Sequence, residues 1–101
     1  MIARYWSARM PVGSLPLYTR HFVEHVSPQL KSIPGFVRAE LLTRSAGPNA
    51  ELIVLSIWQS MESISAFAGP DPEAAVVAPA AAVLFSDCDH RVRHFEISAA
   101  V

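Results

Sequence analysis

The sequence has a single cysteine, Cys88, among its 101 residues. One thiol cannot form a disulfide within the chain, and no set of cysteines has the spacing of a zinc motif. We therefore interpret Cys88 as a small, partly buried side chain. The residues after Met1 also lack the charged and then apolar pattern of a signal peptide, which favours a cytoplasmic protein.

Charged residues are scarce and their signs are balanced. Eight lysine and arginine residues stand against nine aspartate and glutamate residues, so the net charge is -1. A nucleic acid or an anionic membrane would favour a basic surface, so the balance argues against both partners. No apolar run approaches the roughly 20 residues that a membrane-spanning helix needs. Apolar residues, in contrast, make up 51% of the chain, which is enough for one folded domain over residues 1–101.

The most informative stretch lies between residues 51 and 71. Its near-continuous apolar run over 52–58 predicts a central strand buried on both faces, because a half-exposed strand would alternate with polar residues. Ser60 is the predicted N-cap of a short helix, which Gly69 can end in a left-handed conformation. The stretch therefore predicts a strand, a tight corner and a short helix.

Alternation of side chains predicts three more strands, over residues 2–9, 36–44 and 90–97, with a hairpin loop at 46–49. A second helical region is predicted over 71–85. Its start, Asp71-Pro72-Glu73, has an acidic cap and a proline in the first turn, and an alanine- and valine-rich run follows. Pro79 is predicted to bend or divide this region.

A longer helix is predicted to begin at Ser14, its N-cap. Because Pro28 removes a helix hydrogen bond, we expect a kink or a break there, with Ser27 capping a short second piece. His21 and His25 lie one turn apart in this helix, which is the spacing of a two-histidine metal site. No acidic ligand or third histidine has matching spacing, so we predict two partly exposed polar residues and no metal site.

The predicted order of elements is strand, helix, strand, strand, helix pair and strand. This order is typical of an α+β protein with the ferredoxin-like split βαβ arrangement, in which helices cover one face of a four-stranded antiparallel sheet. Alternation places large apolar side chains on the uncovered face: Trp6, Phe36, Leu42, Trp58 and Val92. Such an area is a liability on a monomer, so we expect a second copy to cover it and predict a homodimer.

Seven side chains that can carry chemistry are predicted to project from the strands on the side away from the helices: Arg4, Trp6, Arg38, Ser56, Trp58, His94 and Glu96. Less specific interpretations stay open for several of them. The two tryptophans have the character of core residues, and Arg4 and Glu96, on neighbouring strands, can form an ion pair. His94 is the sharpest candidate, since an imidazole can accept a proton near neutral pH, although a packing role is the alternative.

Several short motifs recur in the order found in one known family: Ile2-Ala3-Arg4 with Trp6, Pro34-Gly35-Phe36, Trp58-x-Ser60, Phe67-Ala68-Gly69 and Val92-x-His94-Phe95. Over residues 2–97 the chain thereby resembles the antibiotic biosynthesis monooxygenase family of dimeric α/β barrels. The resemblance implies a homodimer whose two sheets face each other, with a pocket between sheet and helices in each copy. It does not imply one activity, because this fold hosts many reactions.

The heme-degrading members of that family provide a specific test. They share an asparagine on the first strand, a tryptophan in the helix after Trp-x-Ser, and a histidine about ten residues further on. The corresponding places here hold Ser7, Phe67 and Val77. We therefore predict that the protein lacks the family's axial ligand and does not degrade heme.

The first functional hypothesis is a cofactor-independent monooxygenase acting on a small aromatic molecule, either quinol or polyketide-like. It assigns His94 as the base, Arg4 or Arg38 as the anion partner, and Trp6 and Trp58 as aromatic walls. Ser56 and Glu96 complete the predicted substrate contacts, and no cofactor is expected because the sequence has no nucleotide, flavin or metal motif.

The second hypothesis is a non-catalytic dimer that binds a small molecule or acts as a scaffold. The missing heme residues and the lack of an unambiguous acid–base pair favour it. The volume of the pocket distinguishes the two hypotheses, since a space filled by tryptophan side chains would leave no room for a substrate.

Overall fold

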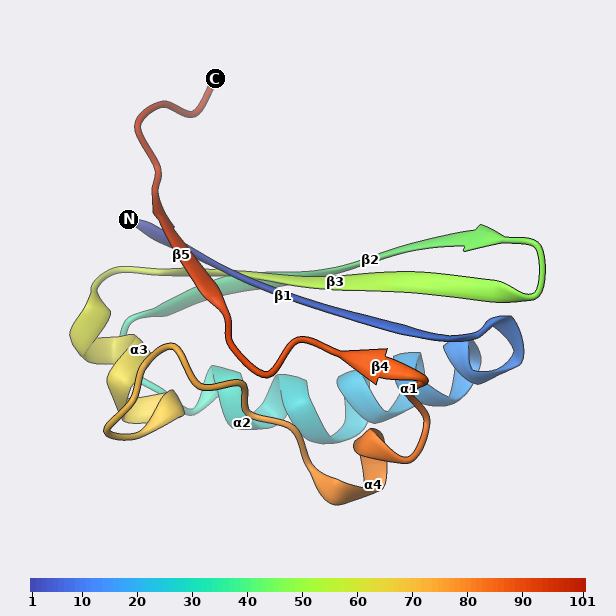
Figure 1. Cartoon of the computed structure of the whole chain (residues 1–101). Coiled ribbons are helices and arrows are strands. Elements are labelled where there is room, and N and C mark those ends of the chain that lie inside the picture. The colour runs from blue at the N-terminus through green and yellow to red at the C-terminus, as the bar shows by residue number, and fades with distance from the viewer.

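A computed structural model describes all 101 residues and shows one antiparallel sheet with every helix against the same face (Figure 1). The strand order is β2 (Phe36–Ala46), β3 (Asn49–Trp58), β1 (Ile2–Pro11), and then β4 (Asp87–Cys88) and β5 (Arg93–Glu96), which both pair with β1. This is the predicted α+β, ferredoxin-like fold. The apolar run that begins at residue 52 forms a central strand, as expected. The expected burial of both its faces is wrong, because Ile53 and Leu55 are only partly buried on the face that no helix covers.

The last predicted strand, over 90–97, is shortened to β5, and the short strand β4 forms before it where no strand was predicted, so the sheet has five strands rather than four. Between β4 and β5 the chain leaves the edge of β1 and pairs instead with the segment after α3. Ala75 N–H donates to His90 O at 3.0 Å, and Val92 N–H donates to Glu73 O at 2.8 Å. The excursion gives residues 73–75 a backbone partner of their own.

The first helical region is continuous and comprises a 3-10 turn (η1, Val12–Ser14), α1 (Leu15–His21), a π-helical turn (η2, Phe22–Val26) and α2 (Ser27–Lys31). The expected break at Pro28 is absent, and neither Ser14 nor Ser27 caps a helix through its side chain. The N–H of Ser27 instead donates to the carbonyl of Phe22, five residues back. A wider turn next to the proline thus keeps the chain helical, as π-bulges do elsewhere.

The corner after the central strand forms as predicted. Ser60 Oγ accepts from Ser63 N–H at 3.3 Å at the start of α3 (Met61–Ala68), and Gly69, with φ of +86°, ends it. Gly35 faces the same corner with φ of +93°, and a Cβ there would lie 2.4 Å from Ser63 Oγ. Only glycine fits at that position, because both the backbone conformation and the space exclude a side chain.

Residues 71–85 do not form the predicted helix, and only α4 (Pro79–Ala82) is helical. The Asp71 carboxylate caps a local turn, accepting from Glu73 N–H at 3.1 Å. The carbonyls of Pro72 and Ala74, which a helix would bond to its own backbone, accept instead from Arg4. A tertiary contact therefore overrides the local helix signal.

The predicted side for the large aromatic residues is wrong. Directly opposed residues share a face of a sheet, and Trp58 lies opposite Ile2 and Phe36. Trp58 packs with Leu30 of α2 and Ile64 of α3, and Trp6 stacks near Tyr18 of α1. Trp6, Phe36, Trp58 and Val92 therefore belong to the core under the helices, and of the five residues expected on the uncovered face Leu42 alone lies there.

The uncovered face of the sheet has its own apolar side chains, alternating with those under the helices: Tyr5, Leu42, Ile53, Leu55, Ile57 and Phe95. Phe95 is 48% exposed on this face. Ion pairs such as Arg38–Glu40, at 3.2 Å, lie among them. We refer to this surface as the open face. None of the helices is long and apolar enough to cross a membrane.

Candidate functional site

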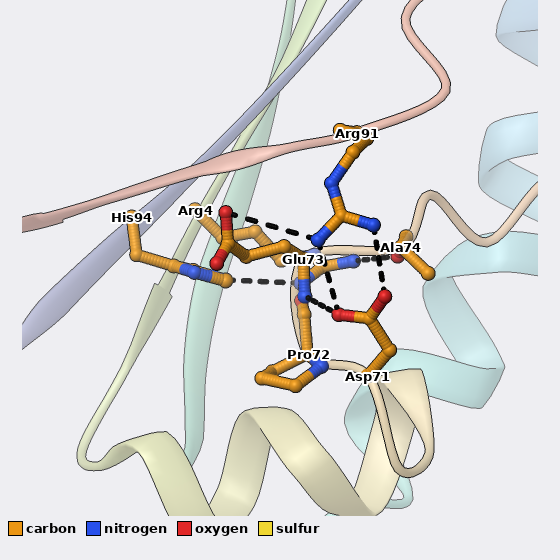
Figure 2. Close-up of polar contacts among 7 residues, drawn as sticks. All are labelled: Arg4, Asp71, Pro72, Glu73, Ala74, Arg91 and His94. Carbon is orange, nitrogen blue, oxygen red and sulfur yellow. Dashed lines mark hydrogen bonds and ion pairs between the residues drawn. The ribbon is translucent and has the colours of Figure 1, made fainter.

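Arg4 is the buried charge of the molecule, with 4% of its surface exposed. Its guanidinium donates to the carbonyl oxygens of Pro72 and Ala74, the latter at 2.9 Å (Figure 2). The guanidinium carbon also lies 5.7 Å from the centre of the Phe67 ring. No carboxylate is paired with it. Burial lowers the pKa of Arg4 to about 10, so at neutral pH it stays a cation without a counter-ion.

His94 lies opposite Arg4 on β5, with its Nε2 3.0 Å from Arg4 Nη1. A guanidinium has only donors, so Nε2 must accept and the ring proton must be on Nδ1. Burial lowers the pKa of His94, and the positive charge of Arg4 lowers it further, against a smaller opposing effect of Glu73. His94 is therefore neutral at pH 7, with the lone pair of Nε2 directed at Arg4.

The expected contact between Arg4 and Glu96 does not form. Glu96 lies opposite Ile2, two pairs further along the sheet, and is exposed. Arg4 is paired with His94 instead, because the register of β5 places the imidazole directly across from it.

The segment that supplies the two carbonyls is fixed from its other side. Arg91 forms a two-pronged ion pair with Asp71, with N–O distances of 2.8 and 3.3 Å, and Ala74 pairs with Arg91 in a backbone bridge (Figure 2). The hydrogen bonds from Arg91 lower the pKa of Asp71, so the pair is charged at neutral pH. The positions of the Pro72 and Ala74 carbonyls toward Arg4 are thus set by the chain itself.

Two adjacent pockets lie between the sheet and the helices. The inner pocket, with a cavity volume of about 50 Å³, is lined mainly by apolar side chains together with Arg4 and Ser56. The outer pocket, of about 190 Å³, contains His21, His25 and Gln29 in its wall. Five residues line both pockets, which makes them one continuous site: Trp6, Tyr18, Val26, Phe67 and Val76.

The structure gathers only some of the predicted site residues, and on the helix-covered side instead of the side away from the helices. Arg4, Trp6 and Ser56 line the inner pocket. Trp58 is fully buried behind it, and its indole N–H donates to Ser56 Oγ at 2.9 Å. His94 contacts the pocket only through Arg4.

Arg38 lies apart from this site. It is paired with Glu40, and its register opposite Ile57 places it on the open face.

Three groups of the site were not among the predicted site residues. Tyr18 and Phe67 form aromatic walls of both pockets. His21 and His25 had been judged partly exposed, and they line the outer pocket. Their one-turn spacing was the available signal, but the sequence alone did not show that this side of the helix faces a cavity.

No protein-family model and no curated protein matches the sequence. Solved structures do match. An MhuD variant with two manganese protoporphyrin IX molecules per active site has a TM-score of 0.71 and 21% identity, over 100% of this chain and 98% of that one. The heme degrader MhuD from Mycobacterium tuberculosis, with two hemes bound, has a TM-score of 0.66 and 22% identity, over 100% and 99%.

A Bacillus cereus protein assigned to the antibiotic biosynthesis monooxygenases has a TM-score of 0.70 and 13% identity, over 99% of this chain and 93% of its own. The resemblance to this family is therefore confirmed in the fold. At these identities the comparison concerns the fold alone.

Of the three residues compared with the heme degraders, two line the pockets and one does not. Phe67 lines both pockets and Val77 lines the outer one. Ser7, however, lies opposite Ile53 on the open face and accepts from Arg9 Nη1 at 3.2 Å. The neighbouring residue that points into the pocket is Trp6.

Proposed function

We propose that the protein is a cofactor-independent, monooxygenase-like enzyme acting on a small aromatic quinol or phenol in the pocket between sheet and helices. The observation that carries this proposal is the buried guanidinium of Arg4, without a carboxylate partner, at the end of an aromatic-walled pocket. Buried charges are normally paired. An oxygen anion on a bound aromatic molecule would supply the missing partner.

The chemistry needs little from the protein. An electron-rich phenolate can transfer an electron to dioxygen, and the two radicals combine to a peroxide on a ring carbon. Loss of water then gives a quinone, so that one phenol and one O₂ yield one quinone and one H₂O. Arg4 would hold the oxygen on which the charge resides, either the phenolate itself or a conjugated carbonyl. Ser56, whose oxygen already accepts from Trp58, keeps its own proton available for the peroxide.

His94 takes a different part in this proposal from the base expected at first. Its Nε2 lone pair is directed at Arg4, so accepting a substrate proton there would break that contact and place two cations side by side. His94 is better suited to position the guanidinium, as its third partner after the two carbonyls.

The pocket favours a molecule of one or two rings. Both cavity volumes lie below the range of about 300–1,000 Å³ that is usual for drug-sized ligands. Together with Phe67 and Val77, this argues against a porphyrin substrate, although fold neighbours bind heme. Titration with hemin should give no ligated Soret band, and a ligated band that bleaches with a reductant would contradict this.

Oxygen uptake tests the activity. Reduced naphthoquinones and small hydroxynaphthalenes, offered singly, should raise O₂ consumption above the protein-free rate for at least one compound. The product should carry one atom from ¹⁸O₂, with one O₂ consumed per molecule and no H₂O₂ formed. Activity that survives Arg4→Met unchanged, or no uptake with any compound, would refute the proposal.

One observation favours a second candidate function, a non-catalytic binding protein: the pocket has no unengaged base beside Arg4. Tight binding of aromatic anions without oxygen consumption would support that function over catalysis.

We also propose that the protein is a homodimer formed through the open face. Six apolar side chains lie on this face, and two of them, Leu42 and Phe95, are 41% and 48% exposed. Sedimentation velocity at micromolar concentration should give a dimer, whereas a folded monomer at that concentration would rule this out.

A further inference from the structure

His21 and His25 form a pair on the wall of the outer pocket. His21 ends α1 and His25 lies in the π-helical turn, and their ring centres are 5.4 Å apart. The ring of Tyr18 lies 5.7 Å from that of His21. The pair is therefore held by aromatic contacts on the side of the helix that faces the cavity.

Neither imidazole is neutralised by an acid of its own helix. The ion pair in this part of the chain joins Arg20 and Glu24, at 3.4 Å, and leaves the histidines out. Around the outer pocket the segment over 76–81, the α3 residue Phe67 and the β1 residue Trp6 offer apolar atoms. The remaining titratable group is Tyr18, and burial raises its pKa to about 12, so it stays neutral.

Burial lowers the pKa of His21, and the charge of His25 lowers it further when that ring is protonated. The pair therefore holds at least one free nitrogen lone pair at neutral pH. Because no third histidine, cysteine or carboxylate gathers with the two rings, the pair is suited to proton transfer more than to metal binding.

The two ends of the site complement each other. Arg4 supplies a cation at the inner end, the histidine pair supplies lone pairs at the outer end, and aromatic walls connect them. A conjugated molecule that spans the site can lose a proton at one end while its negative charge is held at the other.

We propose that the His21–His25 pair is the proton acceptor of this site, and that the substrate is a hydroxyaromatic molecule with a second oxygen function directed at Arg4. In the step, the phenolic O–H bond breaks and the proton moves to an imidazole nitrogen. The electron pair of the O–H bond stays on the conjugated molecule and is shared with the oxygen at Arg4. The proton returns before the molecule is released. This inference rests on the proposed function and names its substrate class and its base.

A suitable probe is 6-hydroxy-2-naphthoate, which has a carboxylate at one end and a phenol at the other. Absorption distinguishes the neutral phenol from the naphtholate between pH 5 and 9. When bound to the wild-type protein, the probe should ionise at lower pH, with about a tenfold larger naphtholate to naphthol ratio at a given pH.

The variant His21→Gln/His25→Gln should bind the probe within about threefold of wild type and lose that gain in naphtholate. Both side chains are at least partly exposed, so the variant should fold. His90→Gln, which changes an exposed histidine outside the pockets, is the matched control and should behave as wild type.

The possible results of this experiment distinguish a failure of the inference from a failure of the proposed function. Naphtholate formation that persists in the double variant, with binding that depends on Arg4, overturns the inference and leaves the proposed function intact. Absence of binding to wild type overturns both. If Arg4→Met fails to fold, the contribution of Arg4 is tested on the wild-type protein with 2-naphthol, a probe that lacks the carboxylate. It should bind at least tenfold more weakly while still ionising in a histidine-dependent manner, and equal binding of the two probes would overturn both proposals.

Discussion

The two faces of the sheet place arginine in opposite situations. On the open face, Arg9 contacts Asp87 at 2.8 Å and Asp89 at 3.2 Å. Although burial alone would lower it, the hydrogen bonds to Asp89 and Asp87 raise the pKa of Arg9. Five residues earlier on the same strand but on the helix-covered face, Arg4 has two carbonyls and a neutral imidazole, and its pKa is lowered.

The difference separates structural charges from a charge that is free to bind a ligand. Arg9, Arg38 and Arg44 all have carboxylate partners within the chain, and each pair is mainly solvent-exposed. Such pairs contribute little to stability and are already neutralised. No carboxylate in the chain neutralises Arg4, so an anionic ligand is attracted more strongly to Arg4 than to these paired arginines.

The largest expected effect concerns the packing under the helices. Trp58→Ala removes a side chain with no exposed surface and leaves a cavity among Leu30 and Ile64, which should cost about 3–5 kcal/mol of unfolding free energy. Phe95→Ala on the open face should cost less than about 1 kcal/mol, measured in urea at a concentration low enough to favour the monomer. Equal losses would mean that the faces do not differ in burial as described.

The next effect concerns ligand affinity. Arg4→Met should weaken binding of an aromatic carboxylate by roughly tenfold to a hundredfold, since hydrogen bonds to charged groups contribute about 1.5–3 kcal/mol. Titration calorimetry would measure it. Binding should also decline as the pH rises toward 10 and above, where the free protein loses the charge of Arg4. Arg9→Met is the matched control, and an equal loss of affinity in that variant would contradict the comparison.

The strands and the corner after the central strand could be predicted because their signals are local. Alternation grouped Arg4, Trp6 and Ser56 on one face, and Ser60 and Gly69 marked the ends of a helix. Alternation does not say which face the helices cover, and aromatic residues lie on both sides of β1. Assigning the helices to the wrong face of the sheet therefore misplaced the aromatic residues of that face together.

The helix predicted over 71–85 failed for a different reason. Helix propensity is a local property, and here it competes with the need of Arg4 for two acceptors. Pro72 and Ala74 provide them only if their carbonyls leave the helical ladder. The position of His21 and His25 in a pocket wall could not be predicted either, because the cavity they line is formed by segments distant in the sequence.

A smaller effect is expected from the open face. Leu42→Lys places a charge within the row of apolar residues opposite Ile53 and should weaken the proposed dimer by about 1–2 kcal/mol per buried site. Sedimentation equilibrium would measure the change. Val83→Lys, at a residue that is 82% exposed outside the sheet, is the control and should leave association unchanged. A dimer unaffected by Leu42→Lys would place the interface elsewhere.

The smallest expected effect concerns His94. It is tested by the direction in which the stability of the protein changes with pH. The pKa of His94 in the folded protein lies below its ordinary value, first through burial and then through the charge of Arg4. Its contribution to stability is therefore present above the unfolded pKa, near 6.5, and is lost as the pH falls through the folded pKa.

In His94→Gln the amide oxygen can still accept from Arg4 but does not titrate. The midpoint of urea unfolding, measured from pH 5 to pH 8, should therefore fall less steeply toward acid than in wild type. His90→Gln should retain the wild-type slope, because the contact between Arg4 and His94 is intact in that variant. Parallel profiles for wild type and His94→Gln would show that the contact at 3.0 Å between Arg4 and His94 does not govern the protonation of the imidazole.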